Sequence, residues 1–175
     1  MEFKLTNHER RVFFIITFIF FLICENFELL EQNLVPKYKI KKNIFTFWEP
    51  KEKIPGYLQL CIKTWKKILP EYNITILDYE TTNVLLGETI FSNIICKEMA
   101  KSKQADAIRV AILKKYGGIW MDADTIILNS EFIKKFHNYE LGMFGVEKDK
   151  YQFIGFIYGI ENSTILNEWL KKIIA

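Results

Sequence analysis

The sequence is poor in the features that build metal–sulfur sites, disulfide scaffolds and nucleic-acid surfaces. It has three cysteines, Cys24, Cys61 and Cys96, and none lies in a CxxC motif or in a Cys/His pair at ligand spacing. We therefore expect neither a zinc site nor a disulfide scaffold, and we interpret the cysteines as small hydrophobic residues. The net charge is only +3, and no long run of Lys and Arg is present. Nucleic acid is not an expected partner.

Low-complexity segments and internal repeats are also missing. Half of the 175 residues are hydrophobic and only 26% are charged, which excludes a wholly disordered or collagen-like chain. A chain of this length and composition is sufficient for one globular domain with its own core. We expect that domain to occupy residues 37–175 and to follow a separate segment, residues 1–36.

The N-terminal segment is dominated by an apolar run over residues 12–24, VFFIITFIFFLIC, with basic residues before it and glutamates after it. Thirteen helical residues rise about 20 Å, which is short of the roughly 30 Å hydrocarbon core of a bilayer. The run predicts a single hydrophobic helix that is retained as an uncleaved membrane anchor, and a helix of the core is the alternative. The basic flank would place the remainder across the membrane, whereas a helix lying in the interface would leave the domain in the cytoplasm.

The rest of the chain alternates short strands with helices. The pattern predicts strands over residues 43–48, 73–78, 119–121, 141–146 and 153–158, and helices over residues 58–69, 92–116 and 164–174. This alternation indicates an α/β sheet covered on both faces, in which ligands bind beyond the carboxyl ends of the strands.

The strongest chemical signal lies in residues 116–124, YGGIWMDAD. A helix stop leads into a short apolar strand that ends in Asp122 and Asp124. Two residues apart on an extended chain, these carboxylates would point to one face and could share a Mg²⁺ or Mn²⁺ ion with a nucleoside diphosphate. Such an ion would neutralise charge on a departing phosphate. A polar turn without function is the alternative interpretation, because DxD triplets also occur by chance.

A second signal is the pair Asp106 and Arg109, three residues apart and therefore on one face of the predicted helix. Their neighbours over residues 105–113 are nearly all apolar, so charges in this helix need a reason. Binding of sugar hydroxyls by Asp106, and of a ribose or phosphate by Arg109, would supply one. A structural ion pair is the alternative.

Taken together, several motifs in a fixed order resemble the DXD sugar-binding glycosyltransferases, which include glycosyltransferase family 32 and the related capsular polysaccharide synthesis proteins. They are TFW at 46–48, the Trp65 helix ending in PEY at 70–72, the strand before Asp78, ADAIR at 105–109 and KYGGIWMDAD at 115–124. The similarity covers roughly residues 44–174. It implies a GT-A fold, that is, a Rossmann-like nucleotide-sugar-binding fold, and a hexosyltransferase activity.

The same resemblance implies the partners and the roles of the site residues. The donor would be a UDP- or GDP-sugar, the acceptor a glycan or polysaccharide, the cofactor Mn²⁺ or Mg²⁺, and the anomeric configuration would be retained. Asp122 would meet the ribose and sugar of the donor, Asp124 would bind the metal directly, and Asp106 with Arg109 would hold the transferred sugar. Trp48 would stack on the base; it is equally compatible with the core.

Two alternatives remain at this stage. Residues 119–125, IWMDADT, also fit the DxDxT strand end of dehalogenase-like phosphatases, although no later GDxxxD stretch follows. In addition, the resemblance implies further C-terminal residues, including a later metal or diphosphate ligand, that have no counterpart before Ala175. A domain short of these elements would be a nucleotide-sugar-binding remnant with weak or no transfer.

Overall fold

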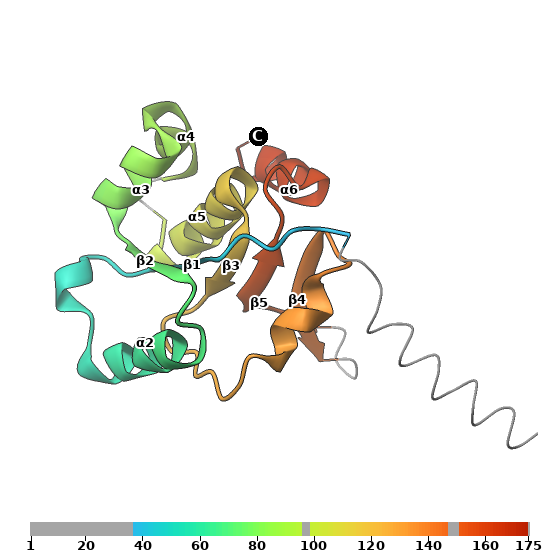
Figure 1. The fold of residues 1–175 in the computed structure, drawn as a ribbon. Coiled ribbons are helices and arrows are strands. Elements are labelled where there is room, and N and C mark those ends of the chain that lie inside the picture. The colour runs from blue at the N-terminus through green and yellow to red at the C-terminus, as the bar shows by residue number, and fades with distance from the viewer. Residues whose placement is uncertain (1–36, 96–98, 147–150, 175) are drawn as a thin grey trace, which may run out of the picture. The chain divides into compact units, whose positions relative to one another are not determined.

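The computed structural model describes residues 37–95, 99–146 and 151–174, which form one α/β unit (Figure 1). The predicted N-terminal hydrophobic helix lies outside the described residues. Five strands make a single sheet in the order β2-β1-β3-β5-β4. Their bounds are β1 Asn43–Phe47, β2 Asn73–Leu77, β3 Gly118–Met121, β4 Leu141–Val146 and β5 Tyr151–Gly159.

The sheet is mixed, with the parallel strands on one side of β3 and the antiparallel strands on the other. β1 pairs in parallel with both β2 and β3, and in register Phe45 lies opposite Trp120. β5 runs antiparallel to both β3 and β4. The predicted α/β class is therefore confirmed, and β3, which carries the two candidate carboxylates at its end, is the central strand.

Helices cover both faces of this sheet. Successive side chains of a strand point to opposite faces, and here both faces carry buried apolar side chains. On one face lie α3 (Tyr79–Leu86), α4 (Glu88–Ile94), α5 (Lys101–Tyr116) and α6 (Thr164–Ile174), packed on Phe45, Trp120 and Ile157. On the other lie α2 (Gly56–Ile68) and the short 3-10 helix η2 (Glu131–Phe136), packed on Ile44, Ile119 and Tyr158 (Figure 1). A 3-10 turn, η1 (Lys51–Lys53), follows β1.

Two glycines turn the chain from α5 into β3. Gly117 and Gly118 have φ angles of 61° and 117°, a left-handed region that disfavours side chains. A Cβ on Gly118 would also lie 2.5 Å from the carbonyl oxygen of Asn43 on β1. The turn is therefore specific to glycine, and it sets α5 directly against the strand that leads to Asp122.

The predicted strands and the helices over residues 58–69 and 164–174 are found close to their expected bounds, and residues 92–116 are largely helical, as expected, but in two helices. α4 ends at Ile94 and α5 begins only at Lys101, with extended backbone at Ile95 and Ala100. The Gln104 side chain donates to the carbonyl oxygen of Met99 (2.8 Å), which ties the chain before the helix in a non-helical path.

The pattern did not predict α3 or the part of α4 that precedes residue 92. Asp78 begins α3 as its N-cap, since Oδ1 accepts a hydrogen bond from the Thr81 amide (2.7 Å). Gly87, with φ of 87°, separates α3 from α4. Cys61 is a buried free thiol, as interpreted from the sequence, whereas Cys24 and Cys96 lie outside the described residues.

The prediction of a membrane-associated protein is contradicted by the helices that the structure describes. Within residues 37–95, 99–146 and 151–174, no helix is long and apolar enough to cross a membrane. The apolar run on which that expectation rests is in residues 1–36, outside the described part of the chain.

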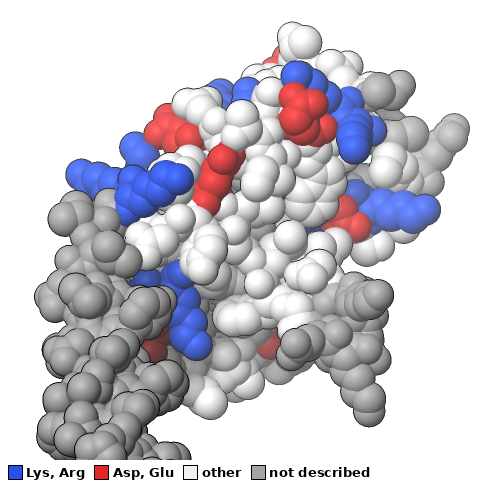
Figure 2. Space-filling view, turned by 90° about the vertical axis from the view of Figure 1, so that its right-hand side faces the viewer, with Lys and Arg blue, Asp and Glu red and all other residues white. Residues whose placement is uncertain are grey.

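On the side that carries β4 and α6, uncharged residues occupy most of the visible surface, with charged side chains mainly toward its upper part (Figure 2).

Candidate functional site

The two candidate carboxylates lie immediately after β3, at its carboxyl end. The Asp122 amide donates to the carbonyl oxygen of Gly155 on β5 (2.7 Å), and the Thr125 amide donates to the carbonyl oxygen of Asp122 (2.9 Å). Residues 122–125 therefore form a turn, and the extended geometry expected for the two aspartates does not apply to them. Asp122 is half-buried and Asp124 is exposed.

The Asp122 carboxylate is held from the sheet side. Its Oδ1 accepts a hydrogen bond from Trp120 Nε1 (2.9 Å) and lies 3.5 Å from Arg109 Nη2. Trp120 is buried and its ring faces α5. Trp120 lies on the α5 face of β3, and these contacts hold the Asp122 carboxylate on the same face, where Arg109 is found.

Arg109 is the buried centre of the site. Only 4% of it is exposed, and its Nη2 lies 2.8 Å from Asp106 Oδ1 as well as near Asp122. Nε donates to the carbonyl oxygen of Ala105 and Nη1 to that of Ile154, while the guanidinium carbon lies 5.1 Å from the centre of the Trp120 ring. The structure thus joins the two predicted pairs into one network, with Arg109 between Asp106 and Asp122.

The Asp106 carboxylate remains half-exposed while its partner is buried. Partial burial raises the pKa of Asp106; the Arg109 charge lowers it, and the negative charge of Asp122 raises it further. A carboxylate that is oriented by a buried arginine and open to solvent is free to accept hydrogen bonds from a ligand. This is neither an ordinary surface ion pair nor a fully buried one.

Gly155 makes room for Asp122. A Cβ at this position would lie 2.7 Å from Asp122 Oδ2 and would also meet the ring of Phe153. Any side chain at position 155 would therefore push the carboxylate away from its place. The sequence contains no signal for this contact, because the pairing of β3 with β5 is decided only in the folded chain.

The carboxyl ends of β1 and β2 form the other side of the site. Trp48 follows β1 directly, and its amide donates to the carbonyl oxygen of Leu77 (2.9 Å). Its side chain is half-buried and belongs to neither core cluster. The interpretation of Trp48 as a core residue is therefore not supported.

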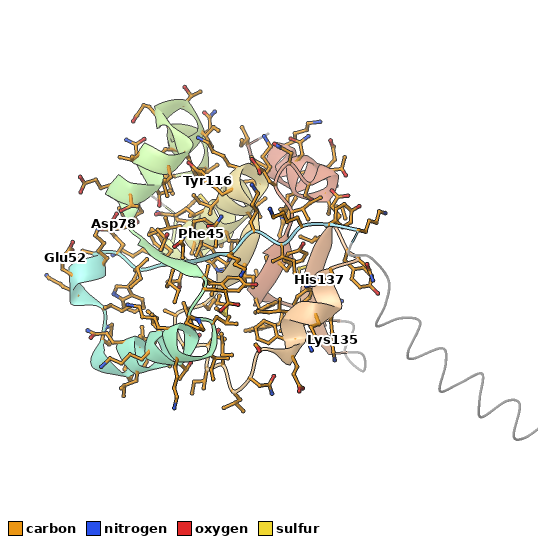
Figure 3. The ribbon with its side chains drawn as sticks, viewed as in Figure 1. Phe45, Glu52, Asp78, Tyr116, Lys135 and His137 are labelled. Atoms are coloured by element: carbon orange, nitrogen blue, oxygen red, sulfur yellow. The ribbon has the colours of Figure 1, made fainter. Side chains whose placement is uncertain are left out.

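Next to Trp48 lies a charged cluster that the sequence analysis did not identify as a site. Lys51 Nζ lies 2.8 Å from Asp78 Oδ2 and donates to Thr81 Oγ1 (3.1 Å). The Tyr79 amide donates to Glu49 Oε2 (2.8 Å). Asp78 lies between β2 and α3, beside the η1 turn that carries Glu52 (Figure 3).

Asp78 is buried, with 6% of it exposed. Burial raises the pKa of its carboxyl, but hydrogen bonds from Lys51 and Thr81 outweigh burial and lower the pKa to about 2. The sequence contains one signal for this cluster, which is the polar residue Asp78 directly after a predicted strand. It contains none for the pairing with Lys51, which lies far from Asp78 in sequence.

The loop after Asp124 is fixed to α2 on the opposite face of the sheet. Trp65 Nε1 donates to the carbonyl oxygen of Thr125 (2.7 Å), and the Ile127 amide donates to Thr64 Oγ1 (3.1 Å). Trp65 is fully buried. This helix therefore fixes the backbone directly after Asp124.

The carboxylates fit a metal ion only if a ligand completes the site. Asp124 has no hydrogen bond or ion pair with the described residues, and Asp122 Oδ2 accepts none from them. Carboxylate oxygens suit Mn²⁺ or Mg²⁺. The described part of the chain holds no group of three or more His, Cys, Asp or Glu arranged for a metal. The remaining ligands would have to be phosphate oxygens or water.

Comparison with known proteins gives the family. A family model described as capsular polysaccharide synthesis protein matches residues 6–174. The chain belongs to the capsular polysaccharide synthesis protein family. The predicted resemblance is confirmed, and in this family member the matched residues include all of the site described above. No curated protein matches the sequence.

The fold of this capsular polysaccharide synthesis family member is also similar to a solved structure titled "PaToxG Glycosyltransferase". The identity is 22%, the TM-score is 0.51, and the match covers 75% of this chain and 59% of that one. At this identity the similarity concerns the fold alone. The chain spans less than two thirds of the length of that structure.

Proposed function

We propose that this protein transfers a sugar from a nucleotide-sugar donor to a hydroxyl group of a glycan or polysaccharide acceptor. The observation that carries the proposal is the network in which buried Arg109 orients two half-exposed carboxylates, Asp106 and Asp122, beside the free carboxylate of Asp124. Membership of the capsular polysaccharide synthesis family supports it, as does the fold shared with a structure titled as a glycosyltransferase.

In this proposal Asp106 accepts hydrogen bonds from hydroxyls of the transferred sugar. Its side chain is 44% exposed and one of its oxygens is held by Arg109, so the carboxylate is oriented before the donor arrives. Arg109 itself is a positioning residue, because its guanidinium is already bonded to Ala105, Ile154 and Asp106. This differs from the direct contact with ribose or phosphate expected from the sequence.

The nucleotide would lie at the carboxyl ends of β1 and β2, with Trp48 against the base. Parallel strands bind ligands at this edge, and Trp48 presents a half-buried ring there. The diphosphate would then reach the end of β3, where Asp122 and Asp124 would hold Mn²⁺ or Mg²⁺. The ion would supply Lewis-acid neutralisation of the charge on the diphosphate.

The reaction would break the bond between the anomeric carbon and the diphosphate oxygen, and form a bond between that carbon and the acceptor oxygen. The leaving diphosphate keeps the bonding electrons, and the acceptor hydroxyl loses its proton to the diphosphate or to water. We extend the proposal to retention of the anomeric configuration. Family membership gives no support to the DxDxT phosphatase interpretation.

The test is a screen of the full chain against UDP- and GDP-sugars with Mn²⁺ or Mg²⁺, with donor binding and sugar transfer measured separately. One class of nucleotide sugar should bind in a metal-dependent way and give a product, whose anomeric configuration is read by NMR. Metal-dependent binding with no hydrolysis or transfer to any acceptor would support the binding-remnant alternative. Absence of nucleotide-sugar binding altogether would contradict the proposal.

A further inference from the structure

The first turns of α5 connect the two sides of the candidate site. α5 lies between α3 and α6 on one face of the sheet (Figure 1). Gln104 and Asp106 both belong to these turns, and side chains two residues apart on an α-helix differ by about 200° in direction. That of Gln104 is buried and contacts Tyr79 of α3, whereas that of Asp106 is half-exposed and lies against Arg109. The stretch of helix that carries Asp106 is therefore also held from the α3 side.

The hydrogen bonds of Tyr79 and Gln104 hold the start of this helix. The Tyr79 hydroxyl donates to Gln104 Oε1 (2.5 Å), and Gln104 Nε2 donates to the carbonyl oxygen of Met99 (2.8 Å). The N-cap residue of α5 is Ala100, which makes no side-chain cap hydrogen bond. The first turn of α5 therefore depends on side chains that lie elsewhere, and Tyr79 is the one that α3 supplies.

Tyr79 is itself fixed to the strand ends at which the nucleotide is proposed to lie. Its amide donates to Glu49 Oε2 (2.8 Å), and Glu49 directly follows Trp48. Its ring packs on Phe47 of β1, with 5.5 Å between the ring centroids. A second link is made by Lys101, whose Nζ donates to the carbonyl oxygen of Glu49 (3.2 Å). The carboxyl end of β1 and the start of α5 are thus joined twice.

We propose that Tyr79 is a positioning residue, whose hydroxyl fixes the start of α5 so that the Asp106 carboxylate meets the sugar of a donor bound beside Trp48. The inference rests on the proposed function and adds to it a residue outside those predicted from the sequence. A nucleotide sugar contacts both ends of the site at once, so their spacing must be set before it binds. The hydroxyl acts on the sugar end, because the hydrogen bond from Tyr79 to Glu49 uses the backbone amide.

Tyr79→Phe tests the inference, because it keeps the ring on Phe47 and the amide bond to Glu49 and removes only the hydroxyl. Calorimetry of the full chain with Mn²⁺ measures the affinity for UDP- and GDP-sugars, with UDP and GDP as sugar-free references. The affinity for the nucleotide sugar should fall about fivefold, the effect of one lost hydrogen bond, and that for the bare diphosphate should stay the same. Tyr116→Phe is the matched control, because it removes a hydroxyl that donates to the Leu85 carbonyl at the other end of α5. It should leave both affinities unchanged.

A double-mutant cycle separates positioning from a general loss of stability. If Tyr79 acts through Asp106, Tyr79→Phe should cause little or no further loss of nucleotide-sugar affinity in a chain that already carries Asp106→Asn. A hydroxyl with a merely structural role would lower the free energy of unfolding in urea in both backgrounds. It would leave the ratio of nucleotide-sugar affinity to diphosphate affinity as it is in the wild type.

The outcomes distinguish this inference from the proposed function. If the wild type binds a nucleotide sugar and Tyr79→Phe binds it equally well, or loses nucleotide sugar and diphosphate equally, Tyr79 is not a positioning residue and the transferase proposal stands. Losses that add fully in the double variant also overturn the inference, because Tyr79 would then act independently of Asp106. If the wild type binds no nucleotide sugar, the proposed function fails, and the inference fails with it.

Discussion

Trp120 Nε1 donates a hydrogen bond of 2.9 Å to Asp122 Oδ1, while the Trp120 ring lies 5.1 Å from the guanidinium carbon of Arg109. The buried Trp120 side chain thus contacts Asp122 through its indole nitrogen and Arg109 through the face of its ring. The indole hydrogen bond fixes the carboxylate, and the ring supports the arginine that orients Asp106. Trp120 is a positioning residue in this arrangement.

Trp120→Phe should lower the affinity for the donor, although the protein should still fold. The variant keeps a ring against Arg109 but removes the hydrogen bond to Asp122, so the free energy of unfolding should fall by about 1 kcal/mol for the hydrogen bond and further for the smaller ring, because Trp120 is buried. Metal-dependent binding of nucleotide sugar, measured by calorimetry, should fall several-fold. Tyr116→Phe is the control, because it removes a hydrogen bond to the Leu85 carbonyl away from the carboxylates. Equal losses of binding in both variants would mean that Trp120 acts only on stability.

Gly155→Ala should displace the Asp122 carboxylate, because the new Cβ would lie 2.7 Å from Oδ2. We expect donor binding to fall at least tenfold while the protein still folds. Gly145→Ala on β4 is the matched control, since its Cβ would meet only the flexible Gln152 amide group at 3.0 Å. If donor titrations of Gly155→Ala match those of the wild type, the close approach of Asp122 to β5 has no role in the site.

Asp124→Asn should abolish the dependence of donor binding on Mn²⁺ or Mg²⁺. The amide keeps the size of the side chain but removes the charge that a hard cation requires. Calorimetry with nucleoside diphosphate, with and without metal, measures the effect. Glu71→Gln removes the same charge at an exposed position on the turn before β2 and should behave as wild type. Metal-dependent binding that survives in Asp124→Asn would refute the metal assignment.

Asp106→Asn should distinguish the sugar from the nucleotide. If Asp106 accepts hydrogen bonds from sugar hydroxyls, nucleotide-sugar affinity should fall tenfold or more, with little change for the bare nucleoside diphosphate. The variant should still fold, because Asn keeps an oxygen that can accept from Arg109, and Arg109 also lies 3.5 Å from Asp122. Parallel losses for the two ligands would instead identify a structural role.

Asp78 should make the fold sensitive to acid. Its pKa in the folded protein is lowered to about 2 from the ordinary 3.8, because hydrogen bonds from Lys51 and Thr81 outweigh burial. The ionised carboxylate therefore stabilises the fold at pH values above about 4, and this contribution is lost as the pH falls from about 4 toward 2. Asp78→Asn, which keeps an N-cap residue, should be less stable than wild type at pH 7.

The difference in free energy of unfolding between Asp78→Asn and wild type should shrink as the pH falls through this window. Urea unfolding at pH 7, 4, 3 and 2 measures it. Lys51→Met should show the same convergence, because it removes the partner of the ionised carboxylate. A difference that stays constant over the range would show that Asp78 acts through its shape as a cap and not through its charge.

Much of the fold followed from local patterns. Short runs of β-branched and aromatic residues predicted the strands, and the glycine pair at 117 and 118 predicted the end of α5, because glycine tolerates the positive φ angles found there. The separate start of α5 at Lys101 was not predicted, and there the Gln104 side chain donates to the Met99 carbonyl, a contact that forms only in the folded chain. The helix α3 was missed because it begins with a cap and carries little apolar periodicity.

The sequence alone determined the family, the α/β class and the residue types available for chemistry. The order of motifs around Asp106, Arg109, Asp122 and Asp124 depends on the linear chain, and local periodicity places each motif on its strand or helix. Only the tertiary structure decided that Arg109 joins Asp106 to Asp122 and that Gly155 makes room for a carboxylate. The physical reason is that these contacts cross between elements far apart in sequence, and their distances are set by sheet pairing and helix packing, which no single segment encodes.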